Sequence, residues 1–186
     1  MQRRLCLWGL LLVVALLTMS CGTRRQVASD EYKQLVLNTL EGDQLGGAGL
    51  GQIMAEMVGD LICEGDSCNL AIRFQYLREQ AHAHQPVVAD YRGRLCSDRR
   101  VRIPKELSDQ HRILCEELTA LFSALDAIRM NSSDALRLLI ACDQESVSCE
   151  SLLQQFSHRL DREGQEILHI REKLRAIEWL RPILTD

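Results

Sequence analysis

Apolar residues in the second half of the chain recur at alternating intervals of four and three residues, and this spacing limits the fold more than any other feature. One series runs from Leu107 to Ile128, and a second runs from Leu153 to Leu184. A four-three alternation places apolar side chains on one face of an α-helix. We therefore predict a helix over 104–130 and a C-terminal helix of about 30 residues, near 45 Å in length.

The first half of the chain shows the same helical spacing in shorter segments. Apolar residues follow it in 29–40, 50–62, 70–84 and 87–95. No segment alternates apolar and polar residues as a strand does, and no Asn-Gly hairpin turn occurs. The predicted fold class is all-α, a disulfide-stapled helical bundle over 29–186 with a long C-terminal helix.

Three positions are expected to interrupt these helices. Gly42 should end the first one, because glycine is favoured just after a helix C-terminus. Pro86 should stop or kink the helix that contains it, since proline lacks the amide hydrogen that continues a helix. The polar stretch 131–134 should break the chain, so that 135–142 forms a separate shorter helix.

The amino end has the pattern of a targeting segment. Arg3 and Arg4 precede an apolar run that is too short to cross a bilayer, as expected of a signal peptide over residues 1–20. The run ends in Leu17-Thr18-Met19-Ser20-Cys21, with a small residue directly before the cysteine. This segment resembles the lipobox of bacterial lipoproteins, whose signal peptide is removed just before a cysteine that receives the lipid.

The resemblance implies that Cys21 is the lipidated amino terminus and that the protein lies in the cell envelope, anchored on the periplasmic side. Gly22 stands where an aspartate would favour the inner membrane, so it favours the outer membrane. Residues 21–28 then form the lipidated cysteine and a tether, which keeps the helical domain within roughly 25 Å of the bilayer. The alternative is a plain secretory signal that leaves Cys21 as an ordinary thiol.

The cysteine count agrees with lipidation. Of the eight cysteines, Cys6 is lost with the signal peptide and Cys21 takes the lipid, which leaves an even set suited to an oxidising compartment. None of the remaining spacings is the Cys-x2-Cys of a zinc knuckle. Polar turns between helices favour two local pairs, and the third pair follows by elimination. The expected disulfides join Cys63 to Cys68, Cys96 to Cys115, and Cys142 to Cys149.

No catalytic constellation is recognisable in the sequence. It contains no nucleophile beside a base, no inward pair of carboxylates and no His-Glu-x-x-His helix, so we expect neither an enzyme, a metal site nor a cofactor. One alternative is a haem- or metal-binding bundle in which His111 pairs with Met54 or Met57. An envelope enzyme is a further alternative. The simpler interpretation is that His111 is a hydrogen-bonded histidine of the core.

Basic residues gather in the middle of the chain, although the whole sequence carries a formal net charge of −4. The acidic balance argues against nucleic-acid binding. Arginine suits carboxylate and phosphate groups, so this basic segment is a candidate docking patch for an acidic partner, phospholipid headgroups or lipopolysaccharide phosphate. The alternative is a solvated loop. The basic segment consists of Arg92, Arg94, Arg99, Arg100 and Arg102, followed by Lys105.

The end of the C-terminal helix is the second candidate for a partner surface. A helix of about 30 residues outruns the shorter helices available to cover it, so part of its apolar face should remain open. The alternative is that this end folds back and Trp179 is buried. The residues expected to contact the partner are Ile177, Trp179, Leu180 and Leu184.

Taken together, the lipobox, the paired cysteines and the helical pattern predict a membrane-anchored envelope lipoprotein. We expect it to act as a binding, scaffold or assembly factor for an envelope protein.

Overall fold

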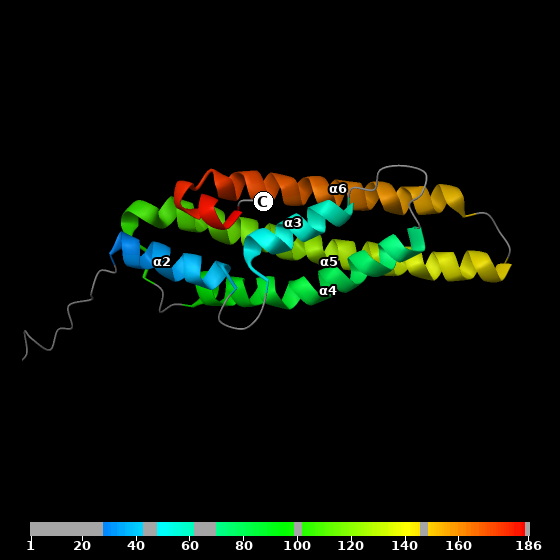
Figure 1. Cartoon of the computed structure of the whole chain (residues 1–186), viewed down its shortest axis with the longest axis horizontal. Coiled ribbons are helices and arrows are strands. Elements are labelled where there is room, and N and C mark those ends of the chain that lie inside the picture. The colour runs from blue at the N-terminus through cyan, green and yellow to red at the C-terminus, as the bar shows by residue number, and fades with distance from the viewer. Residues whose placement is uncertain (1–27, 43–47, 62–69, 99–101, 146–148, 185–186) are drawn as a thin grey trace, which may run out of the picture.

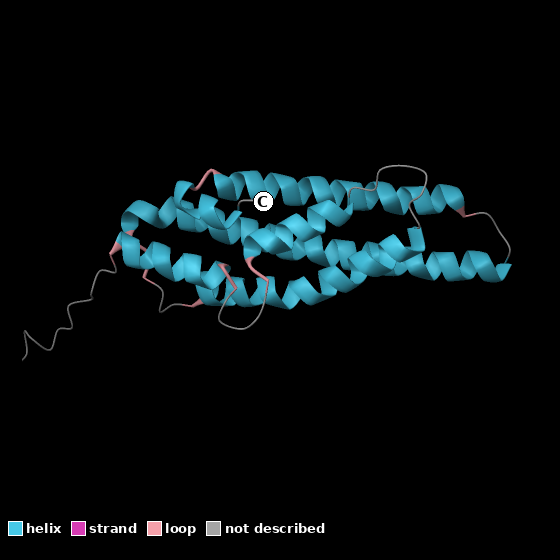
Figure 2. Cartoon of the chain, in the orientation of Figure 1, coloured by secondary structure: helices cyan, strands magenta, loops and turns pink. Residues whose placement is uncertain are grey.

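The computed structural model describes residues 28–42, 48–61, 70–98, 102–145 and 149–184. Within these ranges every regular element is a helix (Figure 2), which confirms the predicted all-α fold. Cys21 and the rest of the segment 1–27 lie outside the described residues. The longer helices are α2 Ser29–Leu40, α3 Leu50–Leu61, α4 Leu70–Arg92, α5 Ser108–Glu145 and α6 Glu150–Arg175; the short ones are the π-helical turn η1 Gly93–Ser97 and the 3-10 helices η2 Lys105–Leu107 and η3 Glu178–Leu184.

Helices α4, α5 and α6 lie side by side in an elongated bundle (Figure 1). Helix α5 runs opposite to both of its neighbours, and its 38 residues rise about 57 Å at about 1.5 Å per residue. Helices α2, α3 and η3 pack together over the half of the bundle that holds the start of α5 (Figure 1). The other half consists of the end of α5 with the starts of α6 and α4.

The core follows the four-three spacing of the sequence. On α5 the apolar residues of the predicted four-three series are fully buried through most of the helix. On α6 the corresponding residues are buried from Leu160 onward. Burial of such apolar side chains supplies the main free energy that holds helices together. The buried members are Leu114, Leu118, Leu121, Leu125 and Ile128 on α5, and Leu160, Ile167, Ile170 and Leu174 on α6.

Two of the predicted disulfides are confirmed. Cys96 of η1 bonds to Cys115 of α5 across a Cα distance of 5.7 Å. Cys142, near the end of α5, bonds to Cys149, which directly precedes α6, across 6.1 Å. The third predicted pair, between residues 63 and 68, lies outside the described residues. The two described bonds thus tie η1 to α5 and close the turn between α5 and α6.

Helix α5 is continuous through 131–134, so the predicted break and separate helix are wrong. Ser132 is fully buried, and both Ile128 before it and Ala135 after it are core residues. Ser133 donates its hydroxyl to the Arg129 carbonyl at 2.7 Å, four residues back, which satisfies the serine without ending the helix. Burial on both sides of the polar stretch therefore outweighs its weak helix propensity.

Helix α4 continues through Pro86 to Arg92, so the predicted stop is also wrong. Pro86 is exposed, whereas Val88 and Tyr91 beyond it are buried on the helical face that also contains Ala81. Proline removes one backbone hydrogen bond from the helix. Packing of the following turn against the bundle compensates for that loss.

Candidate functional site

The C-terminal end folds back on the bundle, which corrects the expectation of an open apolar face. Helix α6 ends at Arg175, and the chain turns into η3. Ile177, Leu180 and Leu184 are then no more than 3 % exposed. Trp179 is partly buried, and its indole nitrogen donates to Gln110 Oε1 at 2.6 Å. Three of the four expected partner residues are therefore core residues.

Hydrogen bonds hold this fold-back in place. The Arg175 guanidinium donates to the Leu184 carbonyl at 2.9 Å, and Arg181 donates to the Arg175 carbonyl at 3.0 Å. Helix α3 approaches η3 so closely that a Cβ on Gly51 would stand 2.1 Å from the Ile183 carbonyl oxygen. The approach of Gly51 to Ile183 joins residues far apart in the sequence, so helical periodicity alone did not reveal it.

The described residues of the basic segment contact side chains of their own chain. The Arg92 guanidinium lies over the Phe122 ring at 4.9 Å from its centre. Arg94 forms an ion pair with Asp90, one turn back on the helix, at 2.8 Å. Arg102 is exposed, and the arginines at 99 and 100 lie outside the described residues. Arg92 is thus stacked on an aromatic ring, and the charge of Arg94 is partly neutralised by Asp90. That the remaining basic residues form a docking patch stays a prediction.

The end of the bundle farthest from α2 presents apolar side chains to solvent. Here α5 and α6 form a hairpin that the Cys142–Cys149 disulfide closes. We call residues 136–142 of α5 and 150–156 of α6 the hairpin tip. Beyond Ala135 on α5 and before Leu160 on α6, no side chain with described burial is fully buried. The core therefore stops before the helices do.

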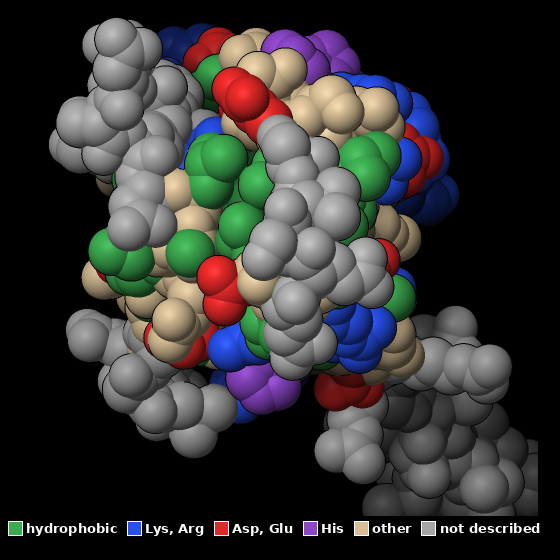
Figure 3. Space-filling view, turned by 90° about the vertical axis from the view of Figure 1, so that its right-hand side faces the viewer, with side chains coloured by type: hydrophobic (Ala, Val, Ile, Leu, Met, Phe, Trp, Pro, Cys, Tyr) green, Lys and Arg blue, Asp and Glu red, His purple; other side chains and the backbone are tan. Residues whose placement is uncertain are grey.

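Large hydrophobic side chains are exposed on the hairpin tip and on the neighbouring start of α4. Ile140 is 60 % exposed and Leu152 is 45 % exposed. On α4, Ile72 is 66 % exposed and Tyr76 is 42 % exposed. Seen end-on, several hydrophobic side chains are visible on this end, with charged side chains above them, below them and on one side (Figure 3). Exposed hydrophobic side chains that gather on one surface are typical of protein contact surfaces.

The hairpin tip was not among the predicted partner surfaces, although the sequence of α5 carries one signal of it. Leu136, Leu138, Leu139 and Ile140 place apolar side chains around more than one face of α5. A helix that covers only one neighbour needs a narrower apolar stripe. The surplus apolar residues therefore marked a segment with more hydrophobic surface than the bundle buries.

The hairpin tip lies at the opposite end of the molecule from the start of α2. Ser29, the first residue of α2, donates its hydroxyl to Glu106, just before α5 begins. Helix α5 then runs its full length of about 57 Å to the hairpin tip (Figure 1). Any segment that precedes Ser29 thus joins the molecule at the end remote from the exposed apolar surface.

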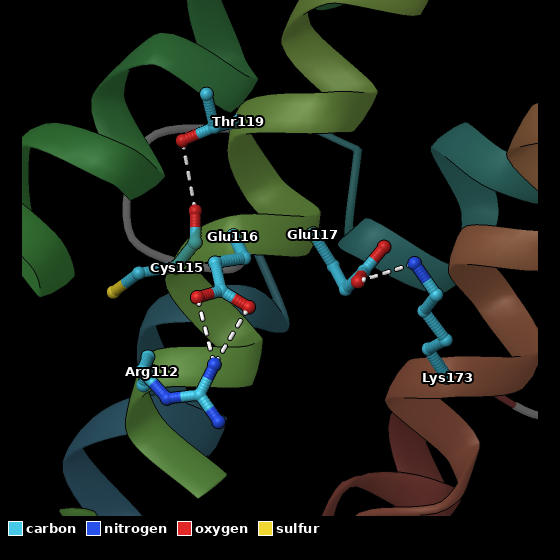
Figure 4. A network of polar contacts seen from close by, with 6 residues as sticks. All are labelled: Arg112, Cys115, Glu116, Glu117, Thr119 and Lys173. Carbon is cyan, nitrogen blue, oxygen red and sulfur yellow. Dashed lines mark hydrogen bonds and ion pairs between the residues drawn. The ribbon is translucent and has the colours of Figure 1, made fainter. Parts of the chain in front are cut away.

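An ion pair between a buried glutamate and an exposed lysine connects α5 and α6. Lys173 donates to Glu117 Oε1 at 2.9 Å, and the Glu117 side chain is only 6 % exposed (Figure 4). The hydrogen bond to this carboxylate raises the pKa of Lys173. On the neighbouring surface of α5, Arg112 pairs with Glu116 at 2.8 Å within the helix (Figure 4). The Lys173–Glu117 pair thus joins α6 to α5.

His111 is held by side chains of its own chain. Its Nδ1 lies 2.5 Å from the Tyr32 hydroxyl, and its Nε2 lies 3.5 Å from Cys115 Sγ. Burial lowers the pKa of His111 and raises the pKa of Tyr32 to about 12. Met54 and Met57 are fully buried core residues. These contacts favour the interpretation that His111 is a hydrogen-bonded histidine over the interpretation that it is a haem ligand.

His82 and His84 lie on different sides of α4. His84 is buried and lies 2.9 Å from Glu56 of α3, whereas His82 points from the exposed side of α4. Across the described ranges, no group of three or more His, Cys, Asp or Glu side chains could hold a metal ion. Nor does any helix in those ranges combine the length and hydropathy needed to cross a membrane.

Comparison of the chain with known protein families, with curated proteins and with solved structures finds no match. The site is therefore defined by its own geometry. Its features are an exposed apolar hairpin tip, a disulfide that fixes it, and an attachment point for the amino-terminal segment at the opposite end of the bundle.

Proposed function

We propose that this protein is a lipid-anchored envelope protein that acts as a binding or assembly factor, and that the hairpin tip is its docking surface for a protein partner. The observation that carries the proposal is the exposure of Ile140 and Leu152 at the end of the bundle remote from α2. A disulfide fixes the two helices that present these side chains. Preorganisation of this kind reduces the entropy lost on binding.

The anchor is the second part of the proposal. Lipidation of Cys21 would attach the chain to the periplasmic side of a membrane, with the outer membrane favoured by Gly22. Because Ser29 lies beside the start of α5, the anchored end and the hairpin tip are opposite ends of the bundle. The protein then presents the hairpin tip to partners up to about 57 Å from its attached end.

The partner element that fits the hairpin tip best is an amphipathic helix of another envelope protein. Along the bundle, α5 packs against both α4 and α6, and α3 also packs against both of them. Its Arg73 contacts Ser157 and Asp161, and α4 begins less than one turn earlier, at Leu70. The described part of α4 therefore reaches little further along α6 than Phe156. Beyond the start of α4, a partner helix could lie beside Leu152 and bury its apolar face there.

Site-specific photocrosslinking in living cells tests the docking surface. A photoreactive residue at Leu152 should form an adduct with another envelope protein, whereas the same residue at exposed Gln165, further along α6, should not. The substitution Ile140→Asp should remove the Leu152 adduct and leave the unfolding midpoint nearly unchanged, because Ile140 is exposed. Equal adducts at both positions, or an adduct with twice the mass of this chain, would contradict a foreign helix as the partner.

The anchor has its own test, independent of the docking surface. Intact mass analysis of the mature protein should show an acylated chain that begins at Cys21. The variant Cys21→Ser should lose the acyl mass and leave the membrane fraction. A water-soluble wild-type chain with a free Cys21 thiol would overturn the anchor and leave the test of the hairpin tip unaffected.

A further inference from the structure

A surface hollow of about 290 Å³ lies between α4 and α5, apart from the hairpin tip. Arg78, Glu79 and His82 line it from α4, and Arg129 and Ser133 line it from α5. A water molecule occupies roughly 30 Å³ of the liquid, so the hollow has room for a ligand of several atoms. All five lining residues carry polar or charged groups, among them two guanidinium groups and one carboxylate.

The helix geometry explains why these side chains converge. Arg78 and His82 are four residues apart on α4, and Arg129 and Ser133 are four residues apart on α5. Residues at this spacing share one face of a helix. Since α4 and α5 are packed antiparallel neighbours, the two faces meet and form a single polar site.

The two arginines retain hydrogen-bonding capacity. Arg129 donates from Nη2 to Asp126 Oδ1 at 2.7 Å, but its buried Nε has no hydrogen-bond partner. Arg78 Nη2 lies 3.9 Å from Glu79 Oε1, which is beyond hydrogen-bond distance. That Glu79 oxygen already accepts a hydrogen bond from Gln75 at 3.1 Å. The Glu79 carboxylate is therefore held at the rim by another donor, and the Arg78 guanidinium is only loosely paired.

We propose that this hollow binds a small anion through a carboxylate or phosphate group, with Arg78 and Arg129 as the recognising residues. Planar guanidinium groups match both kinds of anion with paired N–H donors. The His82 imidazole adds a further ring N–H donor at the site.

Isothermal titration calorimetry of the mature chain with inorganic phosphate and with acetate tests the proposal, using sodium chloride at matched ionic strength as reference. Saturable binding is expected for at least one of the two anions, and the one that binds identifies the preferred group. Arg78→Gln should weaken that binding by roughly tenfold or more, the effect expected for loss of a charge-assisted hydrogen bond. Arg78 is 42 % exposed, so its removal should leave the fold intact.

Arg137→Gln is the matched control, because Arg137 is an 81 % exposed arginine on α5 outside the hollow. This variant should bind the anion as the wild type does. Arg129→Gln is the second test variant and should also lose binding, with its unfolding midpoint measured alongside to establish that the chain is folded. The proposal is overturned if neither anion binds saturably, or if Arg78→Gln and Arg137→Gln change the affinity equally.

Discussion

The charge state of His111 is linked to folding. Burial lowers its pKa, so the folded chain binds a proton at this site less readily than the unfolded chain does. The stabilising effect of the neutral imidazole is complete above the ordinary histidine pKa of about 6.5. It is lost as the pH falls below that value toward the lowered pKa, because protonation then favours the unfolded state.

The variant His111→Gln should therefore show a smaller loss of stability between about pH 7.5 and about pH 5.5 than the wild type, because glutamine does not titrate. Denaturant unfolding at each pH measures this difference. His158→Gln is the control, since the His158 side chain is 81 % exposed, and it should keep the wild-type pH dependence. Identical pH profiles for the wild type and His111→Gln would contradict the link between His111 and folding.

At the scale of elements, the sequence predicted where helices form better than where they end. The spacing of Leu114 and Leu118 identified the buried face of α5, and Gly42, with a φ of 81°, ends α2 as expected. The breaks at Pro86 and 131–134 were wrong, because local propensity was weighed without the packing that surrounds each position. Helix propensity costs up to about 0.7 kcal/mol for an ordinary residue and about 3 kcal/mol for an interior proline, and burial of several core side chains at about 1.5–3 kcal/mol each outweighs both.

Two glycines on α3 allow the effect of close packing on stability to be measured apart from the effect of helix propensity. A Cβ on Gly51 would stand 2.1 Å from the Ile183 backbone oxygen, whereas a Cβ on Gly59 would meet nothing within 4 Å. Gly51→Ala should therefore force α3 and η3 apart and lower the free energy of unfolding by about 1–3 kcal/mol. Gly59→Ala should raise it by up to about 1 kcal/mol, because alanine is the better helix former.

Denaturant unfolding of both variants measures these opposite shifts. Both variants replace glycine by alanine in the same helix, so the gain in helix propensity is nearly equal for the two. The difference between their free energies of unfolding therefore reports the packing at Gly51. Stabilisation by Gly51→Ala, or an equal effect at both positions, would mean that α3 and η3 are not in the close contact described.

At the scale of the whole molecule, the sequence did not predict which apolar surface is left over. The length of the C-terminal helix predicts that part of its apolar face stays exposed. In the structure, η3 covers that face by folding back onto α2, α3 and α6. The exposed surface lies instead on the hairpin tip, where α5 and α6 continue past the core. Which helix covers which face depends on contacts between distant segments, and periodicity in a single helix carries no information about them.

The role of η3 gives a prediction for the molecule as a whole. Truncation after Arg175 removes Ile177, Leu180 and Leu184, each of which is buried. Burial of one such side chain contributes about 1.5–3 kcal/mol, and the faces of α2, α3 and α6 beneath them would become exposed as well. The loss is comparable with the total stability of about 5–15 kcal/mol for a typical domain. We expect the truncated chain to lose cooperative unfolding, as followed by circular dichroism during thermal and denaturant titration.

A single substitution distinguishes loss of packing from loss of a binding segment. Leu180→Ala should lower the free energy of unfolding by about 2–5 kcal/mol, the range for a buried leucine, whereas Glu178→Gln on the exposed side of η3 should have little effect. If the truncated chain instead unfolded cooperatively at the wild-type midpoint, η3 would be an appendage and its apolar residues would again be candidates for a partner surface. Wild-type stability of Leu180→Ala would lead to the same conclusion, because a side chain that contributes nothing to the fold is not part of its core.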